Sequence, residues 1–273
     1  MKNVLTGLAV GLSLLVGVSY SVEAATVTLY NGSGSPSSQG WLIGGGVRTV
    51  LGNPAPVALS ETPVAGGVQV VTNANSAEYA GYSNYNPFTS SLVNASFPSL
   101  DRTLGYSITF SVALNSTTSN SNDRAAFSIT VISSDTSAIE LGFENGLIFA
   151  QNATFTRGEN AAFNTTSAST YTLTVLNSGY TLSNGSQTLS GSLRNYIFNP
   201  ATSSPPLPSN PYTTPNALFF GDNTGQEFGT FTLGAASLTT NDATPVPFGF
   251  HPTFGLFILG VWATFHHFKN KKK

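Results

Sequence analysis

The sequence predicts an all-β protein, an antiparallel β-sandwich, on three observations. Apolar and polar residues alternate along much of the interior, helical periodicity is nearly absent there, and turn residues rich in glycine and asparagine separate short strands. Strands that recur at such spacing favour two stacked antiparallel sheets. Without its two hydrophobic ends the chain keeps about 220 residues, which favours one sandwich domain over residues 25–240.

Three segments alternate most cleanly and are predicted as strands: Tyr106–Val112, Phe127–Val131 and Tyr171–Leu176. Two hairpins are predicted beside them, because Asn-Gly is a strong signal for a two-residue turn. The first joins Ala138–Phe143 to Leu147–Ala150, and the second joins Tyr180–Leu182 to Gln187–Leu189.

The closing strands are predicted at Ala217–Asp222 and Phe228–Leu233, with the early segment Val27–Tyr30 paired to one of them. First and last strands that lie side by side are common in jelly-roll sandwiches. The proline-rich stretch Ala201–Pro211 cannot be a central strand and is expected to form an exposed loop.

The N-terminal residues 1–24 have the features of a signal peptide. Lys2 precedes a short apolar run, and small residues precede a cleavage site predicted after Ala24. The expected partners are the Sec machinery and a signal peptidase, and the mature chain would be exported. The alternative interpretation is an uncleaved membrane helix.

The C-terminal end is predicted to be a linker at 241–247, a transmembrane helix at 248–268 and a basic tail at 269–273. About 20 apolar residues cross a hydrocarbon layer of ~30 Å. The lysines at the end are expected to stay in the cytoplasm, so that the sandwich faces outward; they are Lys269, Lys271, Lys272 and Lys273. The alternative is a hydrophobic tail packed on the domain.

A proline pair, Pro245-Val246-Pro247, an apolar span and a terminal basic cluster together resemble the PEP-CTERM sorting signals that exosortases process. The stretch from Pro247 to Leu256 is similar to a variant associated with cyanobacterial surface proteins. Val246 stands where the family has glutamate, and lysines stand where arginines are usual. The resemblance implies an exosortase-like partner and a cell-surface or extracellular location.

Composition excludes several classes of function for the predicted sandwich. Residues 25–247 hold five arginines, no lysine and eleven acidic residues, a formal charge of −6, so nucleic acid is not an expected partner. Cysteine is absent from the chain, and all three histidines lie in the C-terminal segment. A Ser-His-Asp triad, a lysine Schiff base and an imidazole zinc site are therefore excluded there.

Carboxylates remain as candidates for chemistry. Glu140 and Glu144 would share one face of a strand, yet residues four apart on a strand lie roughly 13 Å apart, too far for a retaining glycosidase. No catalytic residue and no enzymatic activity are predicted. Asp222, Asn223 and Glu227 form a candidate calcium site on a glycine-bearing loop. An Asp-Asn turn with a solvent-facing glutamate is the alternative.

A polysaccharide ligand would need exposed aromatic faces. Tyr79, Tyr82 and Tyr85 could line such a platform, although their spacing also fits an amphipathic turn packed on the sandwich.

The order of the strands resembles the concanavalin A-like, laminin-G-like sandwiches. The residues that carry this resemblance are Ser38–Trp41, Phe127–Val131, Ile139–Phe143 and Leu218–Asp222. That family covers lectins, adhesins and glycosidases. Three hypotheses follow: a non-catalytic surface or extracellular-matrix protein held by its tail, a lectin-like glycan-binding module, and a glycoside hydrolase.

Overall fold

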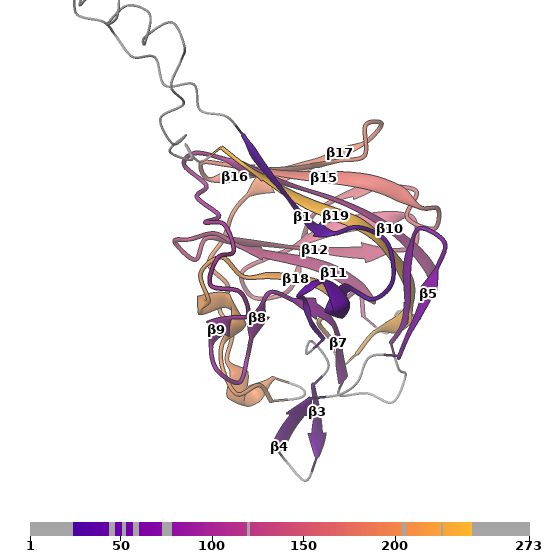
Figure 1. Ribbon diagram of the computed structural model, residues 1–273, viewed down its shortest axis with the longest axis vertical. Helices are drawn as coiled ribbons and strands as arrows, with labels where there is room; N and C mark the ends of the chain where they lie inside the picture. Colours follow the sequence, from indigo (N-terminus) through magenta and orange to yellow (C-terminus); the bar gives the residue numbers. More distant parts are fainter. Residues whose placement is uncertain are drawn as a thin grey trace, which may run out of the picture. The chain divides into compact units, whose positions relative to one another are not determined.

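Two antiparallel β-sheets make up most of the protein in the computed structural model, which describes residues 24–43, 47–50, 53–56, 60–72, 78–118, 121–203, 206–224 and 226–241. Figure 1 shows the sheets as two layers, with β15, β16 and β17 in one and β11, β12 and β18 in the other. The all-β antiparallel sandwich predicted from the sequence is confirmed.

The first sheet has its long strands at the centre. Its order is β17-β16-β15-β10-β19-β6-β5, and β1 pairs with β19 beside β6. The bounds are Thr188–Ser192 for β17, Gly179–Ser183 for β16, Ser169–Leu176 for β15, Tyr106–Thr118 for β10, Phe228–Thr240 for β19, Gly67–Val71 for β6, Ser60–Val64 for β5 and Ala25–Tyr30 for β1.

The second sheet carries the features discussed below. Its order is β14-β13-β12-β11-β18-β7-β3-β4, and β2 pairs with β7. The bounds are Arg157–Ala162 for β14, Leu147–Gln151 for β13, Ala138–Glu144 for β12, Phe127–Ile132 for β11, Leu218–Asp222 for β18, Glu78–Ser83 for β7, Val47–Val50 for β3, Asn53–Pro56 for β4 and Leu42–Ile43 for β2.

The remaining elements are short. Strands β8, Tyr85–Asn86, and β9, Ser91–Leu92, pair with each other, and three 3₁₀ turns complete the described part of the chain: η1 at Pro36–Gln39, η2 at Pro200–Thr202 and η3 at Pro211–Thr213.

Aromatic side chains join the two sheets in the core. Phe110 of β10 lies with its ring centroid 6.1 Å from that of Phe143 on β12 and 5.5 Å from that of Phe220 on β18. Around them pack the inward-facing residues of both sheets, among them Ile108, Ile129 and Leu141. Because side chains on a strand alternate between its two faces, each strand of the second sheet also has a row of residues facing outward.

The predicted hairpins and closing strands are confirmed. Gly146 and Gly185, in the two predicted turns, have φ values of +78° and +87°, a backbone conformation that glycine adopts at little cost. The early strand β1 pairs with β19, so the first and last strands lie side by side. The predicted loop Ala201–Pro211 contains no strand among its described residues and includes parts of η2 and η3.

No helix long and apolar enough to cross a membrane occurs among the described residues. The predicted signal sequence before Ala24, the linker beyond Asn241, Pro245, Val246, Pro247, the predicted helix 248–268 and the terminal lysines lie outside the part of the chain that the structure describes.

Candidate functional site

A row of side chains crosses the outer face of the second sheet. Strand pairing places Ser83 opposite Phe219, Phe219 opposite Thr130, and Thr130 opposite Glu140, so four strands contribute one residue each. Their inward-facing neighbours, such as Ile129 and Phe220, belong to the core. The row therefore lies on the face of the second sheet that points away from the core.

The segment between β17 and β18 folds back across this row. Arg194 pairs with Ala138 as an isolated bridge and starts the crossing. Two Asn-Pro pairs then form short turns, because the Asn199 side chain caps η2 by accepting from the Ala201 amide, and that of Asn210 caps η3 by accepting from the Tyr212 amide.

Four aromatic rings hold this segment against the sheet. Tyr196 and Tyr212 lie with ring centroids 4.7 Å apart, and Phe155 lies 5.2 Å from Tyr196 and 5.3 Å from Tyr212. Phe198 completes the group at 5.4 Å from Tyr212. Contacts at these separations stabilise aromatic pairs by about 0.5–1.5 kcal/mol each, so the crossing segment is fixed over the outer face of the sheet.

Phe155 adopts an unusual backbone conformation in this cluster. Its φ of +60° lies in the left-handed region, which costs a residue with a side chain about 1–2 kcal/mol. The Phe155 carbonyl accepts a hydrogen bond of 2.6 Å from Nη1 of Arg124, and its ring stacks on Tyr196. Packing and this hydrogen bond offset the backbone cost and aim the ring at the site.

Glu140 is the central polar group and is only 2% exposed. Its Oε2 accepts hydrogen bonds from the hydroxyl of Tyr212 and, at 3.3 Å, from Thr130 Oγ1, and the Asn223 side chain also hydrogen-bonds the carboxyl. Burial raises the pKa of Glu140 above its usual value, although these hydrogen bonds and the nearby charge of Arg124 oppose the rise. The carboxyl therefore holds its proton to a higher pH than an exposed glutamate does.

A polar pocket of about 250 Å³ opens beside Glu140. Its described lining includes Arg124, Glu140 and Gln151, together with the rings of Phe155 and Tyr212. The pocket therefore presents a guanidinium, a carboxyl and an amide next to aromatic faces.

Gln151 supplies a hydrogen-bond acceptor that the protein leaves unused. Its side chain is 3% exposed, and Nε2 donates to the carbonyl of Asp123 at 2.6 Å. Oε1 is buried and has no hydrogen-bond partner among the described residues. Since buried polar atoms in folded proteins are nearly always paired, this oxygen fits a donor supplied from outside the chain.

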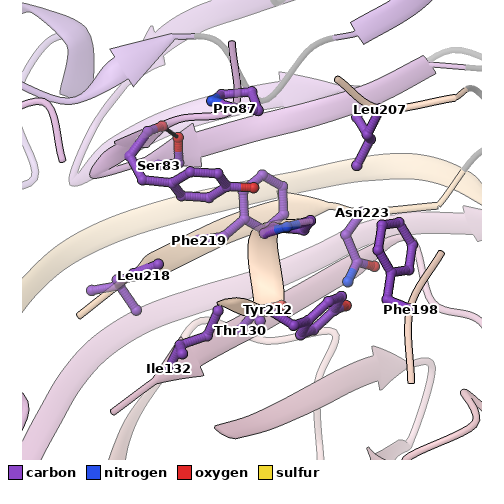
Figure 2. A pocket seen from close by; sticks show the side chains of 13 residues that line it. Ser83, Pro87, Thr130, Ile132, Phe198, Leu207, Tyr212, Leu218, Phe219 and Asn223 are labelled. Atoms are coloured by element: carbon purple, nitrogen blue, oxygen red, sulfur yellow. Dashed lines mark hydrogen bonds between the residues drawn. The ribbon is translucent and has the colours of Figure 1, made fainter. Parts of the chain in front are cut away.

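A smaller apolar pocket of about 70 Å³ adjoins the polar one. Its walls are mostly carbon, from residues that include Pro87, Ile132, Leu207, Pro211, Ala217 and Phe219. Phe198, Tyr212 and Asn223 line both pockets. Figure 2 shows the Asn223 amide between the rings of Phe198 and Tyr212, so this residue stands where the two hollows meet.

The predicted tyrosine platform must be corrected. Tyr82 is 0% exposed in the core and its hydroxyl donates to Glu61, so its ring has no face for a ligand. Tyr85 is half-buried and lines the apolar pocket, whereas the side chain of Tyr79 lies outside the described part of the chain.

The structure separates the residues of the predicted calcium site. Asp222 is buried, accepts from the Thr224 amide at 3.0 Å and hydrogen-bonds Thr72, whereas the next side chain, Asn223, turns to Glu140. Glu227 is buried and accepts from the amide of Ser121, which corrects the alternative of a solvent-facing glutamate. Within the described residues no group of three or more histidine, cysteine, aspartate or glutamate side chains could hold a metal ion.

Glu144, the second carboxylate considered from the sequence, forms an ion pair with Arg157, whose guanidinium lies 4.4 Å from the ring centroid of Phe149. It does not join Glu140 in the polar pocket.

The site residues that sequence reasoning missed are Arg124, Gln151 and Tyr212, which lie in separate segments. Among these three residues, only Gln151 gave a local signal in the sequence, because it is a polar residue at the end of the apolar strand β13.

Known structures resemble this chain at a low level. A sialidase of Trypanosoma rangeli is 11% identical with a TM-score of 0.43, and the match covers 80% of this chain but 30% of the sialidase. An alginate lyase, A1-II′, is 10% identical with a TM-score of 0.40, covering 81% of this chain and 96% of the lyase. A Shewanella oneidensis protein of unknown function is 14% identical with a TM-score of 0.41, covering 82% and 90%. No family model matches this chain, and no curated protein matches it significantly.

Proposed function

We propose that the sandwich is a glycan-binding module whose site is the polar pocket on the outer face of the second sheet. The observation that carries this proposal is the unpaired Oε1 of Gln151 beside the Glu140 carboxyl and the Asn223 amide. Sugars are bound by fixed polar groups that pair with hydroxyls and by aromatic rings that cover the apolar C–H face. Tyr212 and Phe155 supply such rings in the same pocket.

The size of the polar pocket supports a ligand of one sugar ring. A cavity of about 150 Å³ holds benzene, or roughly 25 Å³ for each non-hydrogen atom. The polar pocket, at about 250 Å³, accordingly has room for ~10 such atoms, close to the size of one pyranose unit. A longer chain would extend from the pocket into solvent.

Binding without hydrolysis is proposed, because most glycosidase families use two carboxyl groups about 5–9.5 Å apart. Glu140 is the one carboxylate among the described residues that line the polar pocket. Glu144 lies four residues along the strand and is paired with Arg157. We therefore expect no turnover of bound glycans.

The cellular setting is part of the proposal and rests on the sequence. The predicted signal peptide, the apolar span at 248–268 and the terminal lysines favour an exported surface or extracellular-matrix protein, either anchored in the membrane or processed by an exosortase-like enzyme. The resemblance to concanavalin A-like sandwiches is compatible with a lectin-like role. A sandwich that holds polysaccharide at the cell surface would combine both hypotheses.

A glycan array tests the proposal directly. The predicted sandwich domain, residues 25–240, is labelled and applied to immobilised plant, algal and bacterial polysaccharides, and the Asn223→Ala variant is applied in parallel. We expect saccharide-specific signals that fall at least tenfold in the variant, because Asn223 contributes to both pockets.

The matched control is Asn160→Ala. Asn160 is exposed on β14, and its amide donates to the carbonyl of Gly158 at 3.2 Å. It is not among the residues that line either pocket. This variant should bind like the natural chain. Absence of any signal on the array, or equal losses in both variants, would contradict the proposed site.

A further inference from the structure

We propose that the ligand is an acetylated glycan, with its sugar ring in the polar pocket and its acetyl group in the apolar pocket. This inference rests on the proposed function and deepens it by naming the substituent that the site selects. It starts from the observation that two hollows of opposite chemistry share one wall, formed by Phe198, Tyr212 and Asn223.

The apolar pocket has the volume of a small substituent. At roughly 25 Å³ for each non-hydrogen atom, about 70 Å³ holds ~3 atoms, the number in an acetyl group. A hydroxyl or a methyl group would leave most of this space empty, with the loss of contacts that a void brings. A second sugar ring would not fit.

The walls of the apolar pocket disfavour an unmodified hydroxyl. Four hydroxyl-bearing side chains line it, Ser83, Tyr85, Thr130 and Tyr212. The protein engages at least three of these hydroxyls: Ser83 Oγ donates to the carbonyl of Tyr85 at 2.6 Å, and those of Thr130 and Tyr212 donate to Glu140. The remaining surface is mostly carbon. Burying a sugar hydroxyl there without a partner would cost free energy, whereas a methyl group gains from leaving water.

The carbonyl of an acetyl group needs a hydrogen-bond donor where the pockets meet. Asn223 stands there, as Figure 2 shows, and its amide nitrogen carries two hydrogens. One hydrogen can serve the Glu140 carboxyl, with which the Asn223 side chain is bonded, and the other can reach a ligand carbonyl. The same residue would then link ring recognition to acetyl recognition.

Leu207 closes the apolar pocket from the crossing segment. Its backbone amide donates to the carbonyl of Pro200 at 2.9 Å, which fixes the position of this half-buried residue. In Figure 2 its side chain points into the space beside Phe219 and Phe198. Leu207 lines the apolar pocket but not the polar one, so a substitution there separates the two parts of the ligand.

The experiment compares glycans with and without acetyl groups. Acetylated xylan and glucomannan are measured before and after alkaline removal of O-acetyl esters, and N-acetylglucosamine oligomers are measured against glucosamine oligomers. These two arms distinguish an ester from an amide as the source of the acetyl group. We expect one acetylated form to bind at least tenfold more tightly than its deacetylated partner, since even one methylene in a fitted pocket discriminates by about 10-fold or more.

The Leu207→Phe variant should remove this preference by filling the apolar pocket. Leu176→Phe is its matched control, because Leu176 is the last residue of β15 and is 53% exposed. If Leu207→Phe does not fold, as judged by circular dichroism, Leu207→Ala gives a second test, because the enlarged pocket should favour propionylated over acetylated xylan. Equal binding of acetylated and deacetylated forms would overturn this inference and leave the glycan site standing. Binding of neither form would overturn the glycan site itself.

Discussion

The hydroxyl of Tyr212 donates a hydrogen bond to the carboxyl of Glu140, although 72 residues separate them in the sequence. Both side chains are buried, so water cannot replace the lost partner if either residue is changed. The bond joins the segment that crosses the second sheet to the strand at the centre of the site. It explains how a proline-rich loop becomes one wall of a pocket.

Loss of this bond should weaken the fold. In Tyr212→Phe the ring remains in the aromatic cluster, but Glu140 loses a donor, and we expect the free energy of unfolding to fall by about 1–3 kcal/mol. Urea denaturation followed by tryptophan fluorescence measures this. The control is Tyr171→Phe, whose hydroxyl makes a long bond of 3.4 Å to the Asn164 carbonyl and a hydrogen bond to the half-buried Ser169, and whose loss should cost less than about 1 kcal/mol. Equal losses in the two variants would count against this account.

The buried carboxyl of Glu140 should make stability depend on pH. Because burial raises its pKa in the folded state, the folded chain keeps the Glu140 proton above the ordinary value of 4.5, and this group favours folding less and less as pH rises through the window above 4.5. Glu140→Gln removes that dependence. Relative to the natural chain, the free energy of unfolding of the variant should increase by up to about 1.4 kcal/mol for each unit that the pH rises within this window.

Asp101→Asn is the control with the opposite sign. Hydrogen bonds from Thr103 lower the pKa of Asp101 below 3.8. The contribution of Asp101 to the stability of the folded chain is therefore present above pH 3.8 and is lost as pH falls through the lowered pKa. Unfolding curves at a series of pH values compare the variants. A difference between Glu140→Gln and the natural chain that does not change with pH would contradict the proposed titration.

Gly81 should not tolerate a side chain. A Cβ built there would lie 2.4 Å from the carbonyl oxygen of Phe220 and 2.5 Å from the ring of Phe219, which covers this glycine on the outer face. Gly81→Ala should therefore lower the free energy of unfolding by about 1–3 kcal/mol or more, and it should distort the Phe219 wall of the apolar pocket. Thermal unfolding and the binding assay measure the two effects.

Gly179→Ala is the matched control for Gly81→Ala. The nearest atom to a Cβ at Gly179 is 3.5 Å away, an ordinary contact, and Gly179 lies at the start of β16 in the other sheet. Because glycine in a strand carries an entropic cost of about 0.5–1 kcal/mol, this variant should be neutral or slightly more stable. A similar loss in both variants would show that crowding at Gly81 is not the cause.

The mature ends of the chain test the export hypothesis. Mass spectrometry of protein from the native host should find Ala25 at the N-terminus, after cleavage following Ala24. A C-terminus near Pro245 would support processing by an exosortase-like enzyme, and an intact Lys273 in the membrane fraction would instead support a simple anchor. Full-length protein in the soluble cytosolic fraction would contradict both.

Much of the fold follows from local patterns. The alternation in Phe127–Ile132 and Tyr171–Leu176 predicts strands because side chains on an extended backbone point alternately to opposite faces. The Asn-Gly pairs at 145–146 and 184–185 predict the hairpins because glycine adopts their positive φ at little cost. These signals depend on neighbouring residues alone, so the sequence by itself determined these elements and the sandwich class, whereas strands such as β5, β6 and β7 were not predicted.

The site depended on the tertiary structure. Arg124, Glu140, Gln151, Tyr212 and Asn223 lie in separate segments, and they meet because β11 pairs with β12 on one side and with β18 on the other, while the crossing segment closes over them. Strand register decided which residues face outward, and it placed Tyr82 in the core. A register shift of one residue moves every side chain of a strand to the opposite face of the sheet, and only packing between distant segments selects the register.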